Sequence, residues 1–205
     1  MNQDEARLQE TPLQETPSKL KTFIQACEQI QPEHPNDIRR FFEGVVGFPY
    51  DKELLLQAFV FLNIERYLPD CDRLLLFEKS PDLGNRTDLG KCDFVYLTHR
   101  QTLCLIETKY IDLDAHGTTA QRRRTKKRKE VLAQVEKLRQ FLSAHWQIPV
   151  AHFEGIVFTT DPSLAAREAA QGITTEFVSI DALFAWQASQ RQTLTPRPPT
   201  RNAHP

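Results

Sequence analysis

The chain has 205 residues, a formal net charge of −1 and 40% hydrophobic residues. This length is sufficient for one domain that buries about 70% of the surface exposed by its unfolded chain. The near-neutral overall charge predicts no particular partner. The four cysteines are too far apart for the closely spaced ligands of a zinc site or an iron–sulfur cluster. No apolar run is long enough to span a bilayer, so we expect no membrane partner and a cytoplasmic protein.

Both ends of the chain are polar and rich in proline, a composition that predicts tails without a packed core. Residues 8–17 read LQETPLQETP, a tandem five-residue repeat, and residues 195–205 read TPRPPTRNAHP. We therefore expect disordered tails at 1–17 and 192–205, and a single folded domain at 18–191. Amphipathic patterns at 18–48 predict N-terminal helices that precede the core.

The core of the domain is predicted to lie at residues 51–160. An apolar helix pattern at 51–68 is followed by three strand patterns, by apolar residues at helical spacing from Val131 to Leu142, and by a strand pattern at 153–160. Residues 161–191 add a C-terminal βα extension. The three consecutive strand patterns are RLLLFEK at 73–79, CDFVYL at 92–97 and TLCLIETKYI at 102–111. Antiparallel strands followed by βα units imply an α/β fold, with a mixed sheet and helices on both faces.

Charged residues interrupt two of these strand patterns. Asp93 begins the second strand, and Glu107 and Lys109 end the third. The link between the two strands, THRQ, is short enough for a hairpin, which places the end of the third strand beside the start of the second. Two carboxylates at one end of a sheet suit Mg²⁺, a cation that prefers oxygen ligands and keeps several waters. The lysine would then serve the attacking water or neutralise charge on a phosphate.

Asp93 and the triplet Glu107-Thr108-Lys109, in this order of elements, resemble the PD-(D/E)XK nuclease superfamily. The resemblance covers about residues 51–160 and implies a restriction-endonuclease-like fold with an α-β-β-β-α-β core. It also implies a Mg²⁺-dependent nuclease that hydrolyses phosphodiester bonds of DNA, with Mn²⁺ able to replace Mg²⁺. Asp93, Glu107 and the backbone carbonyl of Thr108 are the metal ligands that it implies, and Lys109 is a catalytic residue.

The resemblance implies two further catalytic positions, both on helices. Many members carry a glutamate on the helix before the first strand, and Glu65 takes that place here, on the same predicted face as apolar residues. Glu65 could instead pair with Arg66, and Glu78 at the end of the first strand is an alternative to it. Some members also carry a glutamine on the helix after the third strand, where Gln134 has either this role or a structural one. Cys92 stands where the superfamily's name has a proline.

Residues 122–129, RRRTKKRK, place seven basic residues in a run of eight. Lysine and arginine neutralise phosphates and supply most of the non-specific affinity for nucleic acid. Cations near a helix N-terminus also oppose the helix dipole, which argues against a purely structural purpose. We expect this segment to bind nucleic acid and to become ordered only when nucleic acid is present. The residues expected to bind are Arg122, Arg123, Arg124, Lys126, Lys127, Arg128 and Lys129.

Two functions are compatible with these patterns. The first is a metal-dependent nuclease, with DNA favoured over RNA as the substrate. The second is a catalytically idle nuclease-like fold that binds nucleic acid or recruits a partner. The intact set of Asp93, Glu107 and Lys109 favours the enzyme, because a binding module has no need of a costly buried charge cluster. A homodimer is left open, since enzymes that cut both strands are often dimers.

Overall fold

The computed structural model describes residues 18–30, 35–47, 51–80, 82–84, 91–114, 116–165 and 172–194. The predicted tail at 1–17 and residues 195–205 of the predicted tail at 192–205 lie outside the described residues. Helix α7 (Ile180–Leu194) extends three residues past the predicted end of the domain at 191, so that boundary was wrong. Gln187 and Arg191 both donate hydrogen bonds to the Val46 carbonyl, and these bonds hold the end of α7 on α2 (Pro35–Gly47).

The described elements follow the predicted order of helices and strands. In chain order they are α1 (Ser18–Ile30), α2, α3 (Lys52–Leu62), α4 (Ile64–Tyr67), β1 (Cys71–Lys79), β2 (Cys92–Thr98), β3 (Leu103–Lys109), α5 (Thr118–Trp146), the 3-10 turn η1 (Val150–His152), β4 (Phe153–Thr159), α6 (Pro162–Ala165), β5 (Ile173–Phe177) and α7. Among the described residues, none of the helices has both the length and the apolar character needed to cross a membrane.

The five strands form one open mixed sheet in the order β1-β2-β3-β4-β5. The pairs β1–β2 and β2–β3 are antiparallel, whereas β3–β4 and β4–β5 are parallel. The predicted hairpin joins β2 to β3, and a backbone hydrogen bond from Thr98 to Thr102 closes it. The α/β class and the mixed sheet are therefore confirmed. The central strand β3 separates the antiparallel part of the sheet from the parallel part.

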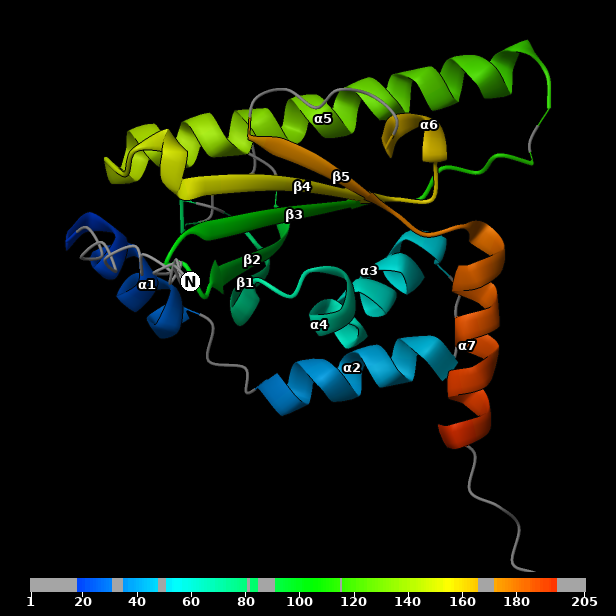
Figure 1. Cartoon of the computed structure of the whole chain (residues 1–205), viewed down its shortest axis with the longest axis horizontal. Helices are drawn as coiled ribbons and strands as arrows, with labels where there is room; N and C mark the ends of the chain where they lie inside the picture. Colours follow the sequence, from blue (N-terminus) through cyan, green and yellow to red (C-terminus); the bar gives the residue numbers. More distant parts are fainter. Residues whose placement is uncertain are drawn as a thin grey trace, which may run out of the picture.

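Helices cover both faces of the sheet (Figure 1). On one face, α2, α3 and α7 enclose a core that includes Phe42, Phe59 and Phe158. On the other face, α1 and α5 pack over Leu105 and other buried side chains of the sheet. Each face of β3 therefore contacts apolar side chains along most of its length, so a charged residue on this strand can approach solvent only at the strand's end.

The helix predicted at 51–68 is interrupted at Asn63. The side-chain amide and the backbone N–H of Asn63 both donate to the Phe59 carbonyl, at 2.8 and 3.1 Å, and the chain then restarts as the short helix α4. Asparagine side chains compete in this way with continued helix formation. The prediction of one continuous helix was wrong, and the residues after Asn63 are shifted off the face that the single-helix pattern gave them.

The basic run at 122–129 is part of α5, which begins at Thr118 after Gly117 with a φ of 98°. The prediction that this segment needs nucleic acid to become ordered was therefore wrong. Tertiary contacts account for the helix, because Lys127 donates to the Tyr110 carbonyl at 3.1 Å and Arg128 pairs with the buried carboxylate of Asp161. These bonds attach the first turns of α5 to the ends of β3 and β4.

Candidate functional site

The end of β3 carries charge where its earlier residues are apolar. The four residues from Leu103 to Ile106 are fully buried between the two helical layers, and Glu107 remains buried with only 3% of its surface exposed. Lys109 is partly exposed at the end of the strand. The parallel neighbour β4 pairs with β3 through Lys109, and Thr159 on β4 donates a hydrogen bond to the Lys109 carbonyl at 2.9 Å. This end of the strand is therefore held in a fixed position.

Asp93 is bound to the end of β3 by two hydrogen bonds from one residue. The backbone N–H of Thr108 donates to Asp93 Oδ2 at 2.7 Å, and the Thr108 hydroxyl donates to the same oxygen at 2.6 Å. The β2–β3 ladder ends at the pair Phe94–Ile106, so the Asp93 side chain takes the place of the next backbone acceptor. The hairpin thus brings Asp93 to the strand end that carries Glu107 and Lys109.

Glu107 is only partly satisfied by hydrogen bonds. Gln134 on α5 donates to its Oε2 atom at 2.9 Å. Its other oxygen, Oε1, is buried and has no hydrogen-bond partner among the described residues. A buried carboxylate oxygen without a partner costs free energy unless a cation or a proton compensates for it. Gln134 therefore orients one oxygen of Glu107 and leaves the second for another group.

Both carboxyl groups have raised pKa values. Burial raises the pKa of Asp93 to about 6, against two opposing hydrogen bonds from Thr108 and with added repulsion from Glu78 and Glu53. Burial also raises the pKa of Glu107 well above its usual range. Repulsion from Asp93 and Glu78 adds to this effect, against opposing hydrogen bonds from the Asp93 backbone N–H and the Cys92 thiol. The mutual repulsion shows that four carboxyl groups share one region: Glu53, Glu78, Asp93 and Glu107.

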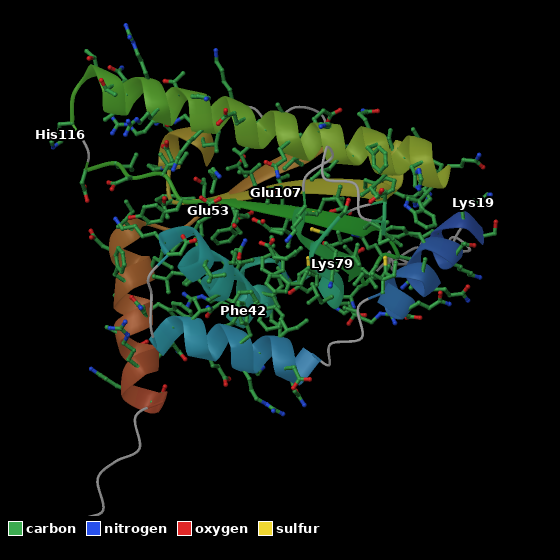
Figure 2. The ribbon with its side chains drawn as sticks, turned by 180° about the vertical axis from the view of Figure 1, so that it is seen from behind. Lys19, Phe42, Glu53, Lys79, Glu107 and His116 are labelled. Carbon is green, nitrogen blue, oxygen red and sulfur yellow. The ribbon has the colours of Figure 1, made fainter. Side chains whose placement is uncertain are left out.

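Lys109 is the cation within this acidic region. Its Nζ atom lies 2.7 Å from Glu53 Oε1, an ion pair between β3 and the first turn of α3. Figure 2 shows Glu53 beside Glu107 at this end of the sheet. Asp51 caps α3 through bonds to the backbone N–H groups of Glu53 and Leu54, which fixes the turn that carries Glu53. One ammonium group thus faces an excess of carboxyl groups.

Glu78 reaches the same region from the end of β1. Its φ of 52° is unusual for a residue other than glycine, and a buried hydrogen-bond partner, Gln57 Nε2, lies 2.9 Å from its Oε1. Among residues that are not glycine, such strained backbone positions cluster at functional sites. The alternative that the sequence left open, Glu78 in place of Glu65, therefore has the geometry to contribute.

The structure does not bring Glu65 to this cluster. The sequence pattern placed it on a buried helical face, but Asn63 interrupts the helix and leaves Glu65 exposed on α4. No hydrogen bond or ion pair found among the described residues joins Glu65 to Asp93, Glu107 or Lys109. The expectation that Glu65 shares the apolar face was wrong, and Glu53 is the helical glutamate beside the strand end.

Sequence reasoning missed Glu53 because its position has an ordinary explanation. Acidic residues are common in the first turn of a helix, where they complement the helix dipole. Glu53 and Glu65 lie near opposite ends of the predicted helix. No local sequence pattern indicates which end of the helix lies against the strands. Only the antiparallel return of the chain into β1, β2 and β3 settles that the N-terminal end of α3 meets the end of β3.

The donor set can be tested against a magnesium site. Within the described part of the chain, no group of three or more histidine, cysteine, aspartate or glutamate side chains is arranged to hold a metal ion. Mg²⁺ needs fewer, because it usually keeps several waters and takes only one or two carboxylates. Burial is the main cause of the raised pKa values of both carboxyls, and the Oε1 atom of Glu107 has no hydrogen-bond partner among the described residues. Asp93 and Glu107 thus offer the one or two carboxylates that Mg²⁺ usually takes from a protein.

The seven basic residues of α5 divide into residues with structural bonds and residues that face solvent. Arg128 is mostly buried and pairs with Asp161, whose side chain is 1% exposed. Lys127 and Arg124 donate to backbone carbonyls between Tyr110 and Leu113, and Lys126 pairs with Glu130 at 3.6 Å on the surface. Three residues are exposed and are joined to no carboxylate by a hydrogen bond or ion pair found among the described residues: Arg122, Arg123 and Lys129.

Comparisons of the chain with protein-family models, with curated proteins and with solved structures found no match. The function of the protein is therefore inferred from its residues and their geometry.

Proposed function

We propose that the protein is a metal-dependent nuclease that hydrolyses phosphodiester bonds of nucleic acid, with DNA as the favoured substrate. The observation that carries this proposal is the pair of carboxyl groups, Asp93 and Glu107, at the same strand end as Lys109. Both carboxyls have raised pKa values and one has a buried oxygen without a partner. Perturbed pKa values of this kind are concentrated at functional sites.

We infer further that the fold is restriction-endonuclease-like. Helix α3, the three antiparallel strands, α5 and β4 follow the α-β-β-β-α-β order of the superfamily that the sequence resembles. In that superfamily's pattern, the acidic residues and the lysine lie on the second and third strands of the core. Asp93 on β2 and Glu107 and Lys109 on β3 occupy those strands here.

Asp93 and Glu107 would hold a Mg²⁺ ion, with the Thr108 backbone carbonyl as a further ligand. The chemistry that this ion supplies when bound is electrostatic stabilisation of negative charge on the phosphate. Thr108 fixes the orientation of Asp93, and Gln134 fixes that of Glu107. These hydrogen bonds prepare the two carboxylates before the substrate arrives.

Lys109 supplies a positive charge at the same strand end, and Glu53 positions its ammonium group. In hydrolysis, a water attacks the phosphorus, one P–O bond breaks, and the departing oxygen gains a proton. The Lys109 ammonium stabilises the negative charge that develops on the phosphate, or hydrogen-bonds the attacking water. The cations exposed on α5 bind neighbouring phosphates and hold the strand without reading its sequence.

Cleavage assays with purified protein test the proposal. Supercoiled plasmid and labelled single- and double-stranded DNA and RNA are incubated with Mg²⁺, with Mn²⁺ and with EDTA. We expect cleavage that EDTA abolishes and that Asp93→Asn, Glu107→Gln and Lys109→Met each reduce by about 100-fold or more, while nucleic-acid binding persists. If the wild type binds nucleic acid and cuts no substrate with either metal, the enzyme proposal fails and the idle binding fold takes its place.

A further inference from the structure

A cavity of about 480 Å³ lies beside the first turns of α5, next to the end of β3. Cationic or potentially cationic side chains gather on its wall: His116, Arg123, Arg124 and Lys127. Asp112 is the one carboxylate on the described wall, and it already pairs with Lys52 at 3.6 Å. The cavity therefore has a net positive lining, which suits an anion.

The side chains on the cavity wall are held in place by the backbone segment that follows β3. Lys127 Nζ donates to the carbonyl of Tyr110, which directly follows Lys109, and Arg124 donates to the carbonyls of Asp112 and Leu113. The segment itself is pinned to the end of β4, where the Thr160 hydroxyl bonds both the N–H and the carbonyl of Ile111. The cavity is thus attached to the proposed active site through a few fixed residues.

Helix stability does not account for these cations. Arg123, Arg124 and Lys127 lie beyond the first turn of α5, where the helix dipole has little effect, but they place three positive side chains on the wall of one cavity, where they repel one another. The position of Arg128 is explained by its ion pair with Asp161. Arg123 is exposed, and no ion pair found among the described residues involves it. An anion in the cavity would relieve the repulsion, and arginine is well suited to phosphate because its planar donors bind two oxygens at once.

The geometry points to a binding site in this cavity for one phosphate group of a nucleic-acid strand, through Arg123 together with Arg124 and Lys127. The choice of nucleic acid rests on the proposed function, whereas the choice of phosphate rests on the cavity itself. A phosphate held here lies at a fixed offset from Asp93 and Glu107. The site therefore sets which phosphodiester bond reaches the acidic cluster, either counted from a terminal phosphate or registered on an internal one.

The test compares two neighbouring arginines of α5 that carry the same charge. Arg123 lines the cavity beside β3, whereas Arg122 lines a second cavity of about 590 Å³ with Lys126, Lys129 and Glu130. The proteins are the full-length wild type, Arg123→Gln and Arg122→Gln, with circular dichroism to show that each is folded. Binding is measured in EDTA by fluorescence polarisation of an internally labelled eight-nucleotide DNA with a 5′-phosphate, with a 3′-phosphate or with neither. Thermal shift with inorganic phosphate provides a readout without nucleic acid.

We expect Arg123→Gln to weaken binding about tenfold more than Arg122→Gln and to lose the stabilisation by inorganic phosphate. If the wild type prefers a phosphorylated end and only Arg123→Gln removes that preference, the phosphate is terminal. If Arg123→Gln weakens all three DNAs equally, and more than Arg122→Gln does, the phosphate is internal.

Equal losses for the two variants, with an equal response to inorganic phosphate, would overturn the inference. That outcome leaves the proposed function standing if the wild type still cuts. Conversely, a phosphate-dependent shift lost only in Arg123→Gln, from a protein that binds no DNA or RNA, would support the phosphate site and reject the nuclease.

Discussion

Asp93 and Glu107 place two buried carboxyl groups on neighbouring strands, and the positive charge at this strand end does not balance them. Lys109 is a positive group at the same strand end, and it is engaged by Glu53. Burial and repulsion therefore raise the pKa values of both carboxyls. In the metal-free protein, such a group favours the folded state when protonated and disfavours it when ionised.

This imbalance predicts how stability changes with pH in the absence of metal. Because the folded-state pKa of Asp93 is raised from 3.8 to about 6, its contribution to stability is present below pH 4 and is lost as the pH rises through about 6. The loss amounts to at most about 3 kcal/mol. Chemical unfolding in EDTA from pH 4 to pH 8 measures it, with Asp93→Asn as the comparison.

The wild type should lose stability relative to Asp93→Asn over this range, and Mg²⁺ at pH 7.5 should restore it in the wild type only. A difference between the two proteins that does not change with pH would show that Asp93 is not strained by burial. Carboxyls remote from Asp93, such as Asp161, affect both proteins equally and cancel in the comparison. Glu107 loses the repulsion from Asp93 in the variant, so its change is part of the measured difference.

Two glutamates on neighbouring helices allow a second test at the scale of single residues. Glu53→Gln removes the partner of Lys109 and should lower the cleavage rate by about 10- to 100-fold, the usual cost of losing a residue that orients a site. Glu65→Gln makes the same chemical change on the exposed surface of α4 and should leave the rate unchanged. Single-turnover kinetics at saturating Mg²⁺ separates the two. A larger effect from Glu65→Gln would restore the original sequence-based assignment.

The sequence could predict Asp93, Glu107 and Lys109 because each is a charge on a strand pattern and a short hairpin relates their positions. Gln134 was named through the superfamily resemblance, which implies a glutamine on the helix after the third strand, and it donates a hydrogen bond to Glu107. Glu53 and the strained backbone of Glu78 were not, since both depend on how α3 and β1 approach the sheet. Contacts between distant elements leave no local signature in the chain.

At the scale of elements, α5 combines two roles that its sequence presents as one basic run. The periodic apolar residues from Val131 onward correctly indicated the face that packs on the sheet. The run before them gave no sign that Arg128 and Lys127 bind groups at the ends of β4 and β3, since those partners lie far away in the sequence. The helical start of α5 was missed for this reason, whereas the break at Asn63 depends on a local hydrogen bond to the Phe59 carbonyl.

Arg128 should therefore contribute to stability more than to affinity for nucleic acid. Its guanidinium pairs with Asp161, whose pKa is lowered by hydrogen bonds from Ser163 and Arg128 that outweigh burial. Arg128→Gln leaves a buried carboxylate without its cation and should lower the free energy of unfolding by about 3 kcal/mol. Arg122→Gln, on the exposed side of the helix, should change it by less than about 0.5 kcal/mol. Urea unfolding at pH 7 measures both, and equal small effects would contradict the structural role.

At the scale of the whole molecule, opposite charges are segregated near one end of the sheet. The chain has a net charge of only −1, but the acidic cluster at the end of β3 lies next to the cationic first turns of α5. This arrangement allows a polyanion to be attracted by the helix while a divalent cation is attracted by the carboxylates. Affinity for nucleic acid should then depend on where the positive charge lies, and not on its total.

Two variants with the same net charge can separate location from total. In one variant, glutamine replaces Arg122, Arg123 and Lys129 on α5. The other carries Lys19, Lys21 and Arg39 as glutamine on α1 and α2, where all three are exposed and Lys19 lies at the opposite end of the molecule from His116 at the start of α5 (Figure 2). Each variant loses three positive charges. Neutralising cations that contact phosphates lowers the affinity and also the number of counterions released on binding.

Binding of a 20-nucleotide DNA, measured in EDTA between 50 and 300 mM salt, distinguishes the two variants. For the α5 variant, the slope of log affinity against log salt should be shallower than for wild type by about 2 to 3, whereas the α1/α2 variant should retain the wild-type slope. Equal slopes in all three proteins would mean that the strand does not follow α5. Equal losses in both variants would mean that only the total charge matters, which the segregation of charge in this molecule argues against.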